Sequence, residues 1–215
     1  MTDTTMPPEP LRWIDARTLA LEGRGWDDTE DCYDRLPVRA KGVVREPVWD
    51  LSRDSAGLAI HFTSDPPELR VRWTLRRTQL AMSHMPASGV SGLDLYFRDG
   101  GAWRWLAAVR PEGAAEAAGV FFEHIAPAPR EFLLYLPLYN GVRLLQLGVP
   151  FACRVEPVAR KGRSIVFYGT SILQGACVSR PGMAYPAILG RRLDRPVVNL
   201  GFSSNGKAEP EMAAL

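Results

Sequence analysis

The chain has 215 residues, of which 46% are hydrophobic, and its 26 Lys and Arg against 24 Asp and Glu give a net charge of +2. This near balance offers no electrostatic case for a nucleic-acid partner, and the length fits one large domain or two modest ones. No stretch is apolar for long enough to cross a bilayer, so no membrane partner is expected.

The N-terminus and the cysteines favour a cytoplasmic location. Met1 to Pro10 are polar and proline-rich, without the apolar segment of a signal peptide. Cys32, Cys153 and Cys177 are odd in number and widely spaced, so they form neither a disulfide framework nor a metal-ligand cluster. Because no paired carboxylates occur at metal-ligand spacing either, we expect no metal and no other cofactor.

Residues 47–158 read as one strand after another. Apolar and polar residues alternate in 58–63, 69–76 and 93–98, a pattern that buries one face of each strand and leaves the other in water. The arginines at 70, 72, 76 and 77 then belong to a solvated face, whereas Trp73 and Trp105 stand at core positions. No helical stripe interrupts the strands, so residues 1–160 are predicted to form an antiparallel β-sandwich, jelly-roll-like in its connections.

Two glycine-containing turns separate these strands. Asp99-Gly100-Gly101 and Asn140-Gly141 lie between apolar runs, where the positive φ angles of tight hairpin turns are needed.

The pattern changes in residues 161–215, which we expect to form a second domain. Lys161 to Arg163 read as a linker, and the elements that follow are predicted in this order: a fully buried strand at Ser164–Tyr168, a helix with Tyr185, Ile188, Leu189 and Leu193 on one stripe, a strand at Val197–Leu200, and a helix over Glu209–Leu215. Strand, helix, strand is the start of a parallel α/β domain. Two strands cannot bury both faces of such a sheet, so this domain is expected to be incomplete.

Ser171 is the main candidate for chemistry. Residues Ile165 to Gly175 place it between an apolar strand and the following helix, with glycines on both sides. A sharp strand-to-helix turn exposes a serine hydroxyl, which needs a base to become a nucleophile, and the backbone N–H there can face an oxyanion. On this stretch alone, Thr170 and Ser171 could equally well cap the helix. A phosphate-binding loop at Gly169 to Gly175 is a weak alternative, because this stretch lacks the lysine and the glycine spacing that such a loop requires.

A second loop of small polar residues follows the next strand. Val197 to Gly206 read Val-Val-Asn-Leu-Gly-Phe-Ser-Ser-Asn-Gly. Neighbouring parallel strands present such loops at the same sheet edge, where the two could face each other across a reacting carbonyl.

Three motifs together resemble the SGNH, or GDSL-type, hydrolases. Gly169-Thr170-Ser171-Ile172 with Gln174-Gly175 looks like block I of that superfamily, and Asn199 to Gly206 looks like block II. Gly92-Leu93-Asp94-Leu95-Tyr96 resembles the Gly-x-Asp-Leu-Tyr signature of the β-sandwich domain that precedes one bacterial branch. We expect Leu93 and Leu95 in the core, with Asp94 and Tyr96 bracing the hydrolase domain.

The resemblance implies roles for individual residues. Ser171 would be the nucleophile and its N–H the first oxyanion donor, within site loops that include Gly169, Thr170, Asn205 and Gly206. The second donor in the family is a glycine N–H, and Ser204 stands at that position here, so a Cβ must fit a conformation suited to glycine. The remaining parts, an asparagine donor and an Asp-x-x-His pair, are expected beyond Leu215.

The implied function is ester hydrolysis of small acyl esters, on a carbohydrate or a secondary metabolite. His61, His84 and His124 all fall in the sandwich region. His84 lies in an expected loop and could in principle act as the base, but a base located beyond Leu215 is the simpler explanation. The 215 residues are therefore predicted to be inactive or nearly so. The alternative is a non-catalytic module that binds a carbohydrate, through its tryptophans, or a protein.

Overall fold

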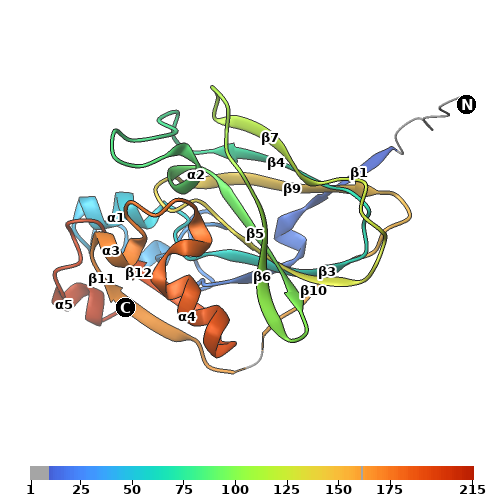
Figure 1. Ribbon diagram of the computed structural model, residues 1–215. Coiled ribbons are helices and arrows are strands. Elements are labelled where there is room, and N and C mark those ends of the chain that lie inside the picture. The colour runs from blue at the N-terminus through green and yellow to red at the C-terminus, as the bar shows by residue number, and fades with distance from the viewer. Residues whose placement is uncertain (1–9, 161) are drawn as a thin grey trace, which may run out of the picture.

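The computed structural model describes residues 10–160 and 162–215 and contains two facing antiparallel sheets (Figure 1). One sheet has the order β1 (Leu11–Asp15), β9 (Val142–Pro150), β4 (Leu69–Leu75), β7 (Glu116–Phe122). The other has the order β10 (Val155–Pro157), β3 (Ala59–Ser64), β8 (Arg130–Tyr135), β5 (Leu93–Asp99), β6 (Ala102–Val109), and β2 (Ala20–Glu22) also pairs with β3. The predicted antiparallel β-rich region is confirmed, while its jelly-roll connections stay a prediction.

Alternating apolar residues from both sheets form the core between them. Ile60, Trp73, Leu95, Phe132 and Leu147 are all at most 1% exposed. The Phe62 and Phe132 rings stack with centroids 5.2 Å apart. As predicted, Leu93 and Leu95 are fully buried.

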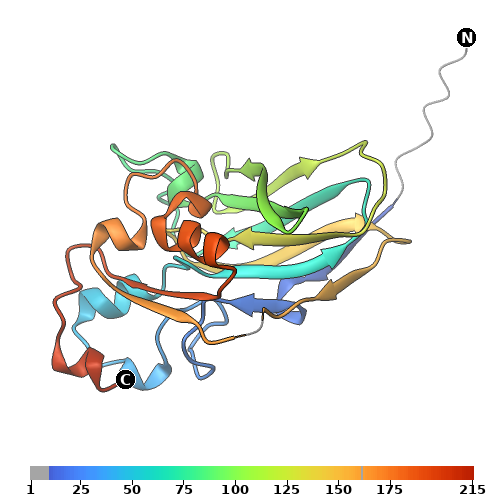
Figure 2. The same cartoon turned by 60° about the horizontal axis from the view of Figure 1, so that its bottom comes forward.

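The outer faces of the two sheets differ, which corrects the expectation that each strand leaves one face in water. On the four-stranded sheet the outward Arg72 is exposed, as predicted. On the other sheet α4 (Tyr185–Leu193) lies over the outer face (Figure 2). The outward Ala59, Tyr96 and Tyr135 are buried there, in one cluster with Ala187 of α4. The middle of this sheet is therefore buried on both faces.

Trp105 contradicts its predicted place in the core. A register shift between Leu95 and Tyr96 pairs Tyr96 with Trp105, so the Trp105 side chain emerges on the outer face and is 52% exposed. A bulge of one residue reverses the side of every residue beyond it, and the alternation alone cannot show where it falls.

The two predicted turns have different outcomes. Gly100 and Gly101, with φ of 54° and 85°, close the β5–β6 hairpin as expected. Asn140-Gly141 instead joins β8 to β9 in the other sheet, and Gly141 does not have a positive φ. Its lack of a side chain serves a close approach, because a Cβ there would lie 2.2 Å from the Arg53 carbonyl oxygen.

Two short helices and two 3-10 turns also interrupt residues 16–90, and the two helices correct the continuous run of strands expected from Pro47 onward. They are η1 (Ala16–Thr18), η2 (Val38–Ala40), α1 (Glu46–Ser52) and α2 (Ala87–Val90). Pro47 stands in the first turn of α1, where its missing N–H costs nothing.

The remaining elements are β11 (Ile165–Gly169), α3 (Ser171–Gln174), η3 (Pro181–Met183), α4, β12 (Val197–Gly201) and α5 (Pro210–Ala213). Strands β11 and β12 pair in parallel, as predicted, with Gly169 opposite Gly201. The helix after β11 is also confirmed, but the α4 residues buried against the rest of the molecule are Pro186, Ala187 and Gly190, while Tyr185 and Leu193 are exposed.

Strand β11 is not the fully buried strand that the sequence predicts. Its residues alternate, and Val166 is 60% exposed. Only β12 flanks it within the described residues, and the face that carries Val166 and Tyr168 is incompletely covered there.

The parallel pair lies between two helical layers of different origin (Figure 2). Helices α3 and α4 cover one face, and the other packs against residues from the first quarter of the chain: Val198, Leu200 and Phe202 form one cluster with Leu36, Ala40, Val44, Val48 and Trp49. Residues before and after position 160 therefore share a buried apolar cluster, and the division into domains 1–160 and 161–215 stays a prediction. Of the expected linker, Lys161 lies outside the described residues.

Arg35 links these parts from inside the protein. Its guanidinium is 1% exposed and donates to four backbone carbonyls, those of Leu51 (2.6 Å), Asp54 (2.8 Å), Asn199 (3.0 Å) and Gly201 (2.8 Å). Two of these carbonyls belong to β12, on the edge that faces away from β11. Arg35 thus satisfies the acceptors of that edge in place of another strand.

Candidate active site

Ser171 lies at the sharp turn between β11 and α3, where it is half-buried as the first residue of the helix. The Thr170 side chain makes no capping hydrogen bond, which removes the main support for a purely capping role. Within the described part of the chain, neither the Ser171 hydroxyl nor its backbone N–H has a hydrogen-bond partner. Both groups are therefore available to a bound molecule.

The second loop lies directly against the end of β11. The Phe202 N–H donates to the Gly169 carbonyl at 2.9 Å, and the Gly206 N–H turns back to the Phe202 carbonyl at 2.9 Å. A Cβ at Gly206 would lie 1.9 Å from the Gly169 oxygen, so only glycine permits this approach. The predicted site loops, Gly169–Ser171 and Ser203–Gly206, are thus neighbours.

Ser204 stands where the family motif has glycine, and its backbone has the conformation that glycine favours. Its φ is 59°, in the left-handed region, where a side chain costs roughly 1 kcal/mol or more. The side chain points to solvent, so it meets no packing obstacle. Its N–H has no partner among residues 10–160 and 162–215, which leaves a second free donor one loop away from Ser171.

An arginine from the N-terminal region holds the far end of this loop. Arg45 donates to the Asn205 side-chain oxygen (2.9 Å), to the Asn205 carbonyl (2.8 Å) and to Glu209 (2.7 Å). The Tyr168 hydroxyl donates to the other Glu209 oxygen at 2.9 Å. Although desolvation raises the pKa of Glu209, the bonds from Arg45 and Tyr168 lower it to about 2, so the carboxylate stays charged. Asn205 therefore serves to anchor the loop.

Two further side chains tie the segment around Ser171 to its surroundings. Asn199, 1% exposed, donates to the Leu173 carbonyl at 2.9 Å and accepts from the Gly201 N–H at 2.8 Å, which fixes α3 on β12. The Tyr139 hydroxyl donates to the Ser171 carbonyl at 3.4 Å. Nothing in the sequence around Tyr139 or Arg45 signals these roles, because their partners lie 32 and 160 residues away.

No histidine hydrogen-bonds to Ser171 within the described residues. His61 is fully buried on the outer face of β3, where its ring nitrogens face Glu22 (2.7 Å) and Glu131 (2.8 Å). His124 follows β7 at the β4 end nearest Pro67, the opposite end from the active-site loops. His84 occupies the exposed Met82–Met85 turn, and Met85 packs against Ala184.

The Gly92–Tyr96 segment braces the region after α3, as predicted. Asp94 is fully buried and accepts from the Gly182 N–H (2.8 Å) and the Trp105 indole N–H (2.9 Å), with Arg180 at 3.3 Å. Burial raises the pKa of Asp94 to about 6, against the opposing effect of these three partners. Tyr96 stacks beneath the Arg191 guanidinium at 3.9 Å.

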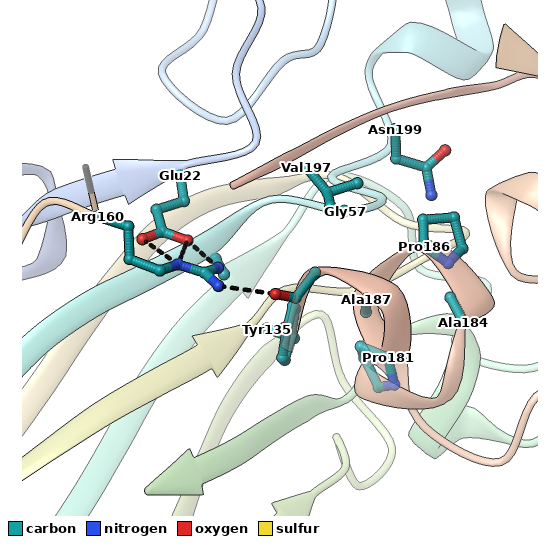
Figure 3. A pocket seen from close by; sticks show the side chains of 12 residues that line it. Glu22, Gly57, Tyr135, Arg160, Pro181, Ala184, Pro186, Ala187, Val197 and Asn199 are labelled. Atoms are coloured by element: carbon teal, nitrogen blue, oxygen red, sulfur yellow. Dashed lines mark hydrogen bonds and ion pairs between the residues drawn. The ribbon is translucent and has the colours of Figure 1, made fainter. Parts of the chain in front are cut away.

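A cavity of about 10 Å³ separates α4 from the six-stranded sheet (Figure 3). Arg160, in a bidentate pair with Glu22, closes one side and Asn199 lies at the other. That volume holds roughly one water molecule, so it excludes a substrate.

Two other features are missing from residues 10–160 and 162–215. No group of three His, Cys, Asp or Glu side chains is placed to hold a metal ion there. None of the helices in 10–160 and 162–215 has the length and apolar character to cross a membrane.

Comparison with known proteins defines the class to which this fold and site belong. Residues 11–154 match the GxDLY family, the N-terminus of SGNH-hydrolase-type esterases, and residues 162–215 match the GDSL-like lipase/acylhydrolase family. The chain belongs to this family of GxDLY-containing, GDSL-like proteins. No curated protein sequence matches it.

Three solved structures show the same arrangement. A protein described as a GDSL-like lipase, from Bacteroides ovatus, is 34% identical with a TM-score of 0.89 over 94% of this chain and 60% of that one. The salicylyl-acyltransferase SsfX3 of a tetracycline biosynthetic pathway (18%, TM-score 0.75) and a family two carbohydrate esterase from Cellvibrio japonicus (13%, TM-score 0.54) share the fold, each over 94% of this chain and 57% of theirs. The chain thus spans about 60% of the length of these proteins.

Proposed function

We propose that the protein is a serine esterase in which Ser171 attacks small acyl esters. The observation that carries this proposal is the pairing of a free Ser171 hydroxyl with two unpaired N–H groups, those of Ser171 and Ser204, on adjacent loops. Membership of the GDSL-like acylhydrolase family supports the reaction class.

The proposed reaction proceeds by acyl transfer. A base takes the Ser171 proton, the oxygen bonds to the ester carbonyl carbon, and the N–H groups of Ser171 and Ser204 stabilise the resulting oxyanion. Collapse of this intermediate expels the alcohol, which leaves with the proton. Water then attacks the acyl-serine, releases the acid and restores the hydroxyl.

We propose further that residues 1–215 by themselves turn over esters slowly or not at all. His61 is engaged by two carboxylates and neither His84 nor His124 bonds to Ser171, so none of them is in place as the base. Loss of the base in serine hydrolases costs up to about 10⁶-fold in kcat. The family resemblance supports an Asp-x-x-His pair elsewhere in the polypeptide.

Turnover of p-nitrophenyl acetate and labelling by a fluorophosphonate probe test both parts. The 215-residue chain should be nearly inert, whereas a chain extended through any coding sequence beyond Leu215 should be active and labelled at Ser171. Ser171→Ala should abolish labelling, and Ser164→Ala, an exposed serine just before β11, should not. Rapid Ser171-dependent turnover by residues 1–215 would refute the requirement for an external base. An unlabelled extended chain that binds glycans would instead favour a binding module.

A further inference from the structure

The Gln174 side chain, three residues after Ser171, is fully buried between the two site loops. Its Nε2 donates to the Leu138 carbonyl at 3.0 Å and to the Asp54 carboxylate at 3.2 Å. Its Oε1 accepts from the Ser203 N–H at 2.8 Å. The amide thus uses both donors and its oxygen on three different segments of the chain.

The partners leave this amide one orientation. A backbone carbonyl only accepts hydrogen bonds and a backbone N–H only donates, so Leu138 and Ser203 each require the opposite end of the Gln174 amide. Asp54 reinforces the choice, since a flipped amide would turn its oxygen toward the carboxylate. Asp54 is itself 1% exposed and held by an ion pair with Arg77.

The bond to Ser203 acts at the entrance of the loop that carries Ser204. Beyond Ser203 the chain passes at once into the left-handed Ser204, whose N–H direction depends on the peptide plane between them. The end of β12 also lies close to the Gln174 backbone, because a Cβ at Gly201 would lie 2.3 Å from the Gln174 backbone nitrogen. Gln174 and Ser171 also share the four-residue helix α3.

We propose that Gln174 is a positioning residue, which Asp54 and the Leu138 carbonyl orient so that it clamps the Ser203 N–H and aims the Ser204 N–H toward the oxygen that develops at Ser171. This role rests on the proposed esterase function. It gives the N-terminal region, through Asp54, a direct part in shaping the active site. The Ser204 N–H that the clamp positions would bind the oxyanion mainly in the transition state. Loss of the clamp therefore lowers kcat more than it changes KM.

The test compares Gln174→Met, which removes the acceptor, with Gln174→Glu, which keeps one, and with the exposed Gln79→Met as the matched control. Hydrogen exchange of the Ser203 amide, followed by NMR, reports the clamp without any need for turnover. We expect exchange at Ser203 to accelerate about 10-fold or more in Gln174→Met, less in Gln174→Glu, and not in the control.

In the chain that shows Ser171-dependent turnover, kcat should fall about 10- to 100-fold in Gln174→Met with KM within about 2-fold, and Gln174→Glu should recover part of the loss. A folded Gln174→Met with unchanged Ser203 exchange, or with unchanged kcat, would overturn the proposal. If Gln174→Met does not fold, Gln174→Glu carries the test: it loses the Nε2 donors to the Leu138 carbonyl and to Asp54, so Ser203 exchange should still rise, and unchanged exchange would overturn the proposal. If the chain extended beyond Leu215 shows no Ser171-dependent turnover, the esterase is refuted instead, and the exchange measurement on residues 1–215 still decides whether the clamp exists.

Discussion

Replacement of Arg35 by methionine should destabilise the protein more than any exposed arginine substitution. Met fills a similar volume but donates nothing, so it leaves four buried carbonyls without the guanidinium that they share. Each such bond contributes about 1–1.5 kcal/mol net, or about 4–6 kcal/mol for the four. Relief of the buried charge offsets part of this, since burial already lowers the pKa of Arg35 to about 10.

The expected net loss is therefore about 3–5 kcal/mol in the free energy of unfolding, or about 8–15 °C in Tm for a chain of this size. Urea unfolding followed by far-UV circular dichroism measures it. Arg39→Met is the matched control: Arg39 lies four residues further on, is half exposed and pairs with Asp28 at 2.6 Å, so its loss should cost less than about 1 kcal/mol. Arg35→Lys should fall between the two. Equal effects for Arg35→Met and Arg39→Met would refute the idea that Arg35 holds the edge of β12.

Two other predictions concern the active-site loop and its brace. Ser204→Gly should raise the free energy of unfolding by about 0.5–1 kcal/mol, because glycine adopts the left-handed φ without strain. Ser83→Gly, in an exposed turn without positive φ, is the control and should lower the free energy of unfolding. A decrease at both positions would contradict the loop geometry. Since the folded pKa of Asp94 is raised to about 6, its contribution to stability is fully present below about pH 4 and declines as pH rises from about 4 to 6. The difference in unfolding free energy between the parent and Asp94→Asn should therefore fall across that window in pH-dependent denaturation, and a difference that rises there would contradict the assignment.

The sequence predicted well what depends on near neighbours. Alternation with period 2 located most strands, and the glycines at 100 and 101 marked the hairpin between β5 and β6. The order of apolar strand, small polar loop and helix placed Ser171 at a strand-to-helix turn. Even the strain at Ser204 followed from comparing one residue with the glycine of the family motif. Each of these features is set by backbone conformation over a few residues.

Other features depended on partners that a local pattern does not contain. Alternation cannot tell water from a packed helix, so the dry outer face of β3 and β5 appears only once α4 covers it. A bulge of one residue in β6 moved Trp105 to the surface, against its core-like spacing. Residues 36–49 became the layer beneath β12 although no strand or helix pattern singled them out.

By itself, then, the sequence determined the strands, the nucleophile candidate and the family. Only the tertiary structure decided what supports the site: Arg35 and Asp54 reach β12 and Gln174 across more than 100 residues of chain, and Arg45 reaches Asn205 across 160. Arg35 and Arg45 reach backbone carbonyls of distant segments, and a backbone carbonyl has no residue-specific signature in the sequence. Such contacts can be found only where the folded chain has brought the two segments together.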